Sequence, residues 1–150
     1  MSSNVERTGS STGEIQRFVG DWYAALDRHA PFEEVEKFLA DGAIRFVFPE
    51  STVTTHDGLR GWYDTVTRKF FDEAHRVDVA DVRPNGGATK VHVSVNWVTR
   101  VWTPPEPTSQ ILEYQADQDW EVEIGADGRP RLRTYVVTGL EPQGDTPALF

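Results

Sequence analysis

Two polar side chains suited to acid–base chemistry fall on strand faces that are otherwise apolar. His75 alternates with Val77 and Val79, and an imidazole there can take or give a proton near neutral pH. Gln118 shares its face with Tyr114, Ala116, Trp120 and Val122. A buried amide needs hydrogen-bond partners, which a bound ligand could supply. We therefore predict His75 and Gln118 as catalytic residues. The alternative for each is a side chain whose partners all belong to the fold.

A third candidate, Tyr23, lies on the apolar stripe of a predicted helix. Its hydroxyl could donate a hydrogen bond to a substrate oxygen, or it could be a core tyrosine with its hydroxyl at the rim of the core. Asp72 and Glu73 directly precede His75 and could orient or charge its imidazole. These two carboxylates are the partners that the sequence offers for His75.

Aromatic residues are the most unusual part of the composition, with five Trp, four Tyr and eight Phe. Aromatic side chains build cores, and they also line the pockets that hold small apolar ligands. We predict a pocket wall made of Trp22, Phe46, Trp62, Tyr63, Phe70, Trp97, Tyr114 and Trp120.

Several function classes have no support in the sequence. There are no cysteines, and the four histidines lack metal-binding spacings, so we expect no metal site. Phosphate-binding glycine motifs are missing, and we expect no cofactor. The net charge of −9 argues against nucleic acid and against an anionic membrane as partner.

The sequence also bears on location. The first 14 residues have no apolar segment typical of a secretory signal, and no stretch approaches the roughly 20 apolar residues of a membrane span. We predict a cytoplasmic protein. Residues 1–10 are rich in Ser and Thr and are predicted to be disordered, residues 11–141 to form one domain, and residues 142–150 to be a loose tail.

Three helices are predicted in the first half of the chain. Ser11 and Glu14 match a capping box, and apolar residues at helical spacing follow as far as His29. A second helix should run from Pro31 to Gly42, and a third from about residue 58 to 71.

Strands dominate the rest of the chain. Residues 43–48 alternate as a short strand between the second and third helices. After the third helix the apolar period changes to two, which predicts long strands over residues 75–83, 89–102, 110–124 and 131–140. We predict an α+β fold in which a curved antiparallel or mixed sheet wraps around three N-terminal helices as a cone.

This order resembles the nuclear-transport-factor-two-like, or SnoaL-like, superfamily, also described as cystatin-like. The resemblance spans residues 12–141 and rests on 18–26 (FVGDWYAAL), 38–48 (FLADGAIRFVF), 58–71 and the hairpin 120–140. The stretches FFDEAH, VNW and QDW also look like uncharacterised bacterial members. The resemblance implies a pocket at the open end of the cone and a homodimer.

The resemblance carries no complete set of catalytic residues. Ketosteroid isomerases place a tyrosine on the first helix, as Tyr23 is here, but their inward acid on a late strand is replaced by Gln118. Glu50 matches their general base by position alone. Polyketide cyclases pair an inward aspartate with a histidine, and here the sequence identifies only the histidine. Asp117 and Asp119 alternate onto the polar face, so they should lie outside.

Two functions remain open. The chain could be a cofactor-independent isomerase, cyclase or hydrolase acting on a small hydrophobic metabolite. It could instead be a non-catalytic ligand-binding or assembly module, dimeric through an outer sheet face that carries Asn96, Arg100, Glu113, Asp117 and Arg133. A hollow cone of roughly 300 Å³ or more would favour the enzyme or a ligand carrier, and a filled cone the structural role.

Overall fold

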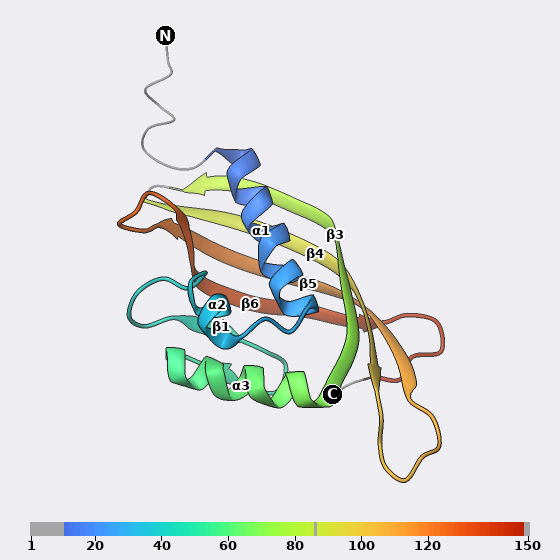
Figure 1. The fold of residues 1–150 in the computed structure, drawn as a ribbon. Coiled ribbons are helices and arrows are strands. Elements are labelled where there is room, and N and C mark those ends of the chain that lie inside the picture. Colours follow the sequence, from blue (N-terminus) through green and yellow to red (C-terminus); the bar gives the residue numbers. More distant parts are fainter. Residues whose placement is uncertain (1–10, 86, 149–150) are drawn as a thin grey trace.

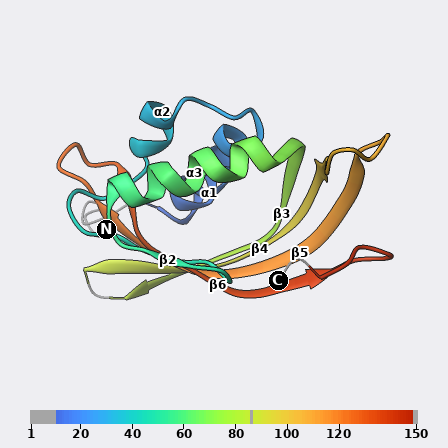
Figure 2. The ribbon, with the colours of Figure 1, turned by 90° about the horizontal axis from the view of Figure 1, so that it is seen from below.

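A computed structural model describes residues 11–85 and 87–148. Helices α1 (Thr12–Asp27), α2 (Phe32–Glu36) and α3 (His56–Lys69) lie on the concave face of one curved sheet (Figures 1 and 2). The predicted α+β fold, with a curved mixed sheet around N-terminal helices, is confirmed. The predicted disordered segment, residues 1–10, lies outside the described residues.

Helix α1 begins as predicted, because Ser11 and Glu14 form a reciprocal capping box. The side chain of Ser11 accepts from the Glu14 backbone N–H, and the Glu14 carboxylate accepts from the Ser11 N–H. The helix ends at Asp27, and His29 then takes a positive φ of 49°. The last turn of α1 lies against strand β3 (Phe70–Asn85), where the candidate site lies.

Helix α2 is shorter than predicted. It ends at Glu36 rather than near Gly42, because the following residues pair with the last strand. Ala40 N–H donates to the Leu132 carbonyl, and Leu132 N–H donates to the Phe38 carbonyl. Helix α3 carries its N-cap on Thr55, whose hydroxyl accepts from the Gly58 N–H.

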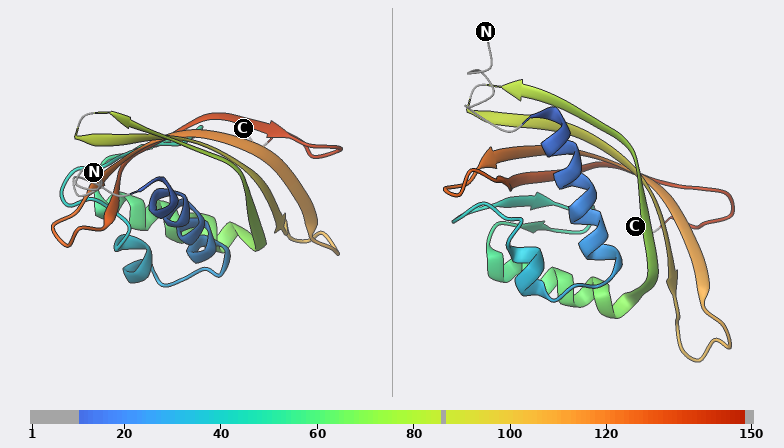
Figure 3. Two further views of the ribbon diagram at one scale, coloured as in Figure 1. Left: turned by 90° about the horizontal axis from the view of Figure 1, so that it is seen from above. Right: turned by 45° about the horizontal axis from the view of Figure 1, so that its top comes forward.

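The sheet has six strands in the order β2-β1-β6-β5-β4-β3, all neighbours antiparallel except β1 and β6. The strand bounds are β1 Arg45–Val47, β2 Thr52–Val53, β3 Phe70–Asn85, β4 Ala88–Val101, β5 Gln110–Ile124 and β6 Pro130–Pro142. The four long strands curl around α1 and α3 (Figure 3). Pro84 fits because β3 is an edge strand, where a missing N–H is tolerated.

Strand β3 starts five residues earlier than predicted and contains two register shifts. Between Phe71 and Ala74, three steps along β3 oppose two along β4, which reverses the face. Glu73 and His75 therefore point to the concave side. A second shift between Val77 and Val79 reverses the face again, so Val79 is 42% exposed, contrary to the inward position that simple alternation predicts.

The core fills the space between α1 and the sheet. Trp22 of α1 and Trp120 of β5 meet edge to face with ring centroids 6.4 Å apart, and Phe46 stacks on Tyr135 at 5.1 Å. All four residues are buried. The described residues contain no helix long and apolar enough to cross a membrane.

Part of the predicted loose tail, residues 142–150, lies beside β5, and residues 149–150 of that tail lie outside the described residues. Glu141 and Pro142 still belong to β6. Gln143 N–H donates to the Glu113 carbonyl, the Glu113 N–H donates to the Thr146 hydroxyl, and the Tyr114 hydroxyl donates to the Pro147 carbonyl. Residues 143–147 thus run along β5 because that strand offers them unpaired backbone groups.

Candidate active site

A cavity of about 120 Å³ opens between the helices and the concave face of the sheet. Its wall is mostly apolar and aromatic, and its polar groups come from α1, α3, β3, β4, β5, β6 and the loop after β1. The lining residues are Tyr23, Leu26, Phe48, Pro49, Glu50, Trp62, Tyr63, Val66, Thr67, Phe70, Glu73, His75, Val95, Trp97, Ala116, Gln118, Tyr135, Val137 and Leu140.

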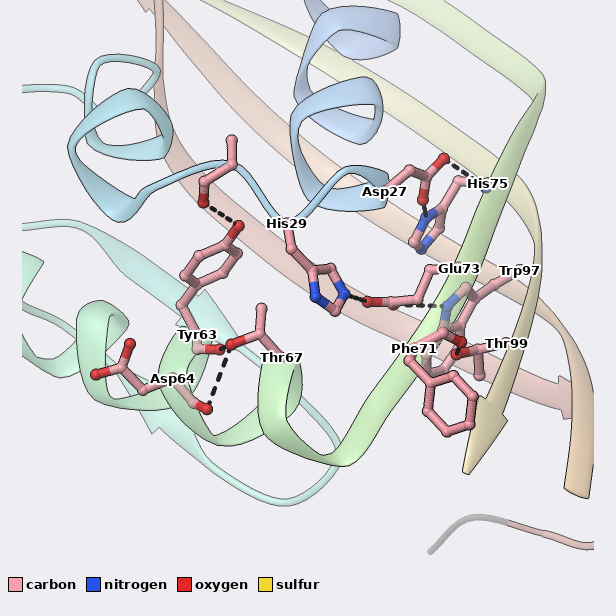
Figure 4. Close-up of polar contacts among 11 residues, drawn as sticks. Asp27, His29, Tyr63, Asp64, Thr67, Phe71, Glu73, His75, Trp97 and Thr99 are labelled. Atoms are coloured by element: carbon pink, nitrogen blue, oxygen red, sulfur yellow. Dashed lines mark hydrogen bonds and ion pairs between the residues drawn. The ribbon is translucent and has the colours of Figure 1, made fainter. Parts of the chain in front are cut away.

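His75 is held by Asp27 at the C-terminal end of α1 (Figure 4). One carboxylate oxygen of Asp27 lies 2.5 Å from Nδ1 of the imidazole, and the other accepts the His75 backbone N–H at 2.9 Å. An ionised carboxylate only accepts hydrogen bonds, so Nδ1 carries the proton, and in the neutral imidazole Nε2 carries a lone pair. Nε2 has no protein partner among the described residues, and the His75 side chain lines the cavity.

A chain of hydrogen bonds fixes the amide of Gln118. The Tyr23 hydroxyl donates to Oε1 of Gln118 at 2.5 Å and lies 3.1 Å from the Tyr135 hydroxyl. Gln118 is 2% exposed, yet in the described part of the chain its amide nitrogen makes no hydrogen bond to protein. Since Oε1 is committed to Tyr23, the amide N–H groups remain available to a ligand.

Aromatic stacking holds the imidazole plane. The Tyr23 and His75 rings stack with centroids 4.6 Å apart, and the Trp97 ring is nearly parallel to the imidazole at 5.8 Å. His75 thus contacts two aromatic rings. Tyr23 also contacts both candidate polar groups, which links His75 to Gln118.

A second carboxylate–imidazole pair lies beside the first (Figure 4). Glu73 Oε2 is 2.5 Å from Nε2 of His29, and its Oε1 accepts the Trp97 indole N–H at 3.1 Å. Asp72 instead faces outward near Arg100 with a side chain 73% exposed. The partner of the His75 imidazole is therefore Asp27, and not Asp72 or Glu73 as the sequence suggested.

Comparison with known proteins identifies the family. Residues 7–136 match the profile of the SnoaL-like domain. The chain belongs to the SnoaL-like family. No protein with a curated description matches this SnoaL-like chain.

Solved structures share the fold at low sequence identity. An aromatic ring hydroxylase candidate from Novosphingobium aromaticivorans superposes with a TM-score of 0.74 and 14% identity over 88% of this chain and 92% of its own. A dehydratase candidate of the NTF2-like family from Streptomyces avermitilis gives 0.70 and 14% over 92% and 96%. A ketosteroid isomerase-like protein from Erwinia carotovora atroseptica gives 0.66 and 16% over 83% and 92%.

The aromatic residues of this SnoaL-like chain divide between wall and core. Of the eight predicted wall residues, four line the cavity: Trp62, Tyr63, Phe70 and Trp97. The other four lie outside the cavity wall in the packed core: Trp22, Phe46, Tyr114 and Trp120. The cavity reaches only the end of the cone, because the other end is filled by α1 against β5 and β6.

The acidic candidates lie in different places. Asp119 lies on the outer face beside the exposed His92, as alternation predicts, and Asp117 shares that face. Glu50 is exposed but lies at the cavity. Asp27 was missed because it closes a helix, where no periodic signal distinguishes it from a solvated carboxylate. In the described ranges 11–85 and 87–148, no group of three or more His, Cys, Asp or Glu is placed to hold a metal ion.

Burial makes all four tyrosines reluctant to ionise. It raises the pKa of Tyr63 and of Tyr135 to about 12, and it raises the pKa of Tyr23 and of Tyr114 above their usual value. In the unfolded chain tyrosine ionises near pH 10. The raised pKa values therefore stabilise the fold fully below about pH 10. For Tyr63 and Tyr135 this contribution is lost as the pH rises through about 12, and for Tyr23 and Tyr114 it is likewise lost as the pH rises.

We expect no tyrosinate absorbance step near pH 10 in the folded protein. The absorbance should rise only at higher pH, together with loss of the near-ultraviolet circular dichroism. In denaturant, all four tyrosines should titrate together near pH 10. Reversible ionisation of any tyrosine near pH 10 without unfolding would contradict the burial described here.

Proposed function

We propose that this protein is a cofactor-independent enzyme that removes a proton from carbon next to a carbonyl group of a small hydrophobic molecule. The observation that carries the proposal is the pairing of two unpartnered groups on one cavity. One is the basic Nε2 of His75, set by Asp27, and the other is the amide nitrogen of Gln118, set by Tyr23.

His75 is the general base. Its Nε2 lone pair takes the proton as the C–H bond breaks, and the electron pair moves onto the carbonyl oxygen as an enolate. Asp27 accepts from Nδ1–H and stabilises the imidazolium that forms. Where the substrate has a C=C bond conjugated with the enolate, return of the proton to the γ carbon gives isomerisation. Where it has a leaving group on the β carbon, departure of that group with the electron pair of its bond gives elimination.

Gln118 donates to the developing enolate oxygen. A donor aimed in advance at that oxygen stabilises the transition state more than it would in water, because the apolar wall lowers the local dielectric. Tyr23 has its own role here. It was expected to donate to the substrate, but its hydroxyl proton is directed at Gln118, so it orients the amide.

The relatives support chemistry of this general kind. Structures that share the fold include proteins described as a dehydratase candidate and as ketosteroid isomerase-like. The SnoaL-like resemblance also implies an aspartate–histidine pair in polyketide cyclases, and Asp27 with His75 forms such a pair. The reaction proposed for this chain rests on that geometry and not on identity, which is below 25%.

Deuterium exchange tests the proposal without a known substrate. The protein is incubated in D₂O with a panel of small apolar ketones and hydroxyketones, and incorporation is read by mass spectrometry. We expect catalysed exchange for at least one ketone, reduced about 100-fold or more by His75→Gln and by a similar factor by Gln118→Leu. His92→Gln, on the exposed outer face, is the matched control and should change nothing.

The small cavity favours one alternative, which is ligand binding without chemistry. A volume of about 120 Å³ holds several waters, so the cone is hollow. This cavity volume is smaller than the roughly 300 Å³ typical of a pocket for larger ligands. We therefore propose a small substrate, or one of which only the reacting part enters. Tight ketone binding with no exchange above the buffer rate would favour the binding module.

The homodimer remains a prediction from the resemblance. We propose that the outer sheet face, where Asn96 and Glu113 hydrogen-bond each other, forms its interface. Sedimentation at high protein concentration tests this, and a monomer would contradict it.

A further inference from the structure

The charged groups at the cavity are all acidic or histidine. Glu50 and Glu73 belong to its lining, and no Lys or Arg of the described chain does. Glu50 is exposed to solvent, whereas the Glu73 side chain is only 9% exposed. Glu73 is therefore the carboxylate that a ligand in the cavity meets in a dry environment, where an unsatisfied charge costs most.

Glu73 is held in place from two sides. His29 approaches one carboxylate oxygen and the Trp97 indole N–H donates to the other (Figure 4). The register shift before Ala74 turns Glu73 to the same face as His75, two residues further along β3. The carboxylate therefore has a fixed position relative to the proposed base.

Two protein partners do not saturate this carboxylate. Two oxygens offer about four lone-pair sites, of which His29 and Trp97 use one on each oxygen. The remaining sites accept hydrogen bonds only. A ligand hydroxyl or ammonium can satisfy them, whereas a ligand carboxylate would place like charge against them, and no Lys or Arg of the described residues lines the cavity to offset it.

We propose that Glu73 is the specificity-determining anchor of the cavity, and that it accepts a hydrogen bond from a donor group on a neutral or cationic apolar ligand while excluding anionic ligands. This deepens the function proposed above, since it states what the substrate carries besides its carbonyl group. The carbonyl oxygen faces Gln118, and the donor group faces Glu73.

Single-ring probes of matched size test this by binding alone. Benzyl alcohol, benzylamine and benzoate are titrated into the ¹⁵N-labelled protein, and the indole N–H signals are followed, with that of Trp97 assigned from a Trp97→Phe variant. We expect the alcohol and the amine to shift the Trp97 signal, and benzoate to bind about tenfold more weakly or not at all. The two donor-bearing probes distinguish a preference for hydroxyl from one for ammonium.

A pair of variants assigns the effect to one carboxylate. Glu73→Gln keeps the size but lets the side chain donate, so benzoate should then bind within about threefold of the alcohol. Glu106→Gln, at an exposed glutamate outside the cavity lining, should keep the wild-type order. If Glu73→Gln does not fold, the wild-type titration still decides, because it needs no variant at Glu73.

Two results would overturn the assignment. One is equal binding of benzoate and benzyl alcohol to the wild type, and the other is unchanged discrimination in a folded Glu73→Gln variant. Neither bears on deuterium exchange by His75. Conversely, the protein could bind alcohols selectively and catalyse no deuterium exchange. That result would contradict the proposed reaction and leave the role of Glu73 unaffected.

Discussion

Asp27→Asn is expected to lower the rate of ketone deuterium exchange by about 1,000-fold while the protein stays folded. An asparagine can donate its amide N–H to Nδ1 of His75, which moves the imidazole proton to Nε2 and removes the lone pair that faces the cavity. In a catalytic triad a change of this kind costs up to about 10⁴-fold through the wrong tautomer.

The tautomer can be measured independently of turnover. ¹⁵N chemical shifts of the His75 ring should report a proton on Nδ1 in the wild type and on Nε2 in Asp27→Asn. Asp21→Asn is the matched control, since Asp21 lies on the exposed side of the same helix. An Asp27→Asn variant that exchanges at the wild-type rate with an unchanged tautomer would show that Asp27 has no part in catalysis.

Trp120→Ala is expected to lower the free energy of unfolding by about 3–5 kcal/mol, as large-to-small changes of buried aromatics do. Trp120 is 1% exposed and its ring contacts Phe18, Trp22 and Tyr23. The ring packs against Trp22 of α1 and Tyr135 of β6, and the surrounding structure relaxes only partially when such a side chain is removed. Urea denaturation followed by circular dichroism measures the change.

Trp102→Ala provides the comparison, because the Trp102 side chain is 54% exposed on the hairpin between β4 and β5. It should change the free energy of unfolding by no more than about 0.5 kcal/mol. Similar losses for the two variants would mean that Trp120 does not belong to the core. Because Trp120 packs on Tyr23, its removal should also loosen the hydrogen bond that orients Gln118.

Local sequence patterns were sufficient to predict most of the fold. The capping box of Ser11 with Glu14, the apolar stripe of the first helix and the period of two after residue 75 all depend on neighbours within a few positions. Alternation also placed His75 and Gln118 on the concave face, because one face of a half-buried strand must be apolar.

The same patterns gave wrong predictions where a long-range contact overrode the local conformational preference of the chain. The second helix stops at Glu36 because Leu132, nearly a hundred positions along the chain, takes the backbone bonds of Phe38 and Ala40. Val79 is exposed because of a register shift that alternation cannot reveal.

By itself, the sequence determined the element order, the family resemblance and the inward faces that carry His75 and Gln118. Only the tertiary structure decided the partners of these residues. Asp27 and His75 are 48 positions apart, and Tyr23 and Gln118 are 95 apart. Periodicity tells which way a side chain points, but a hydrogen bond depends on where α1 ends against the bulged strand β3, and that position is set by packing of the whole core.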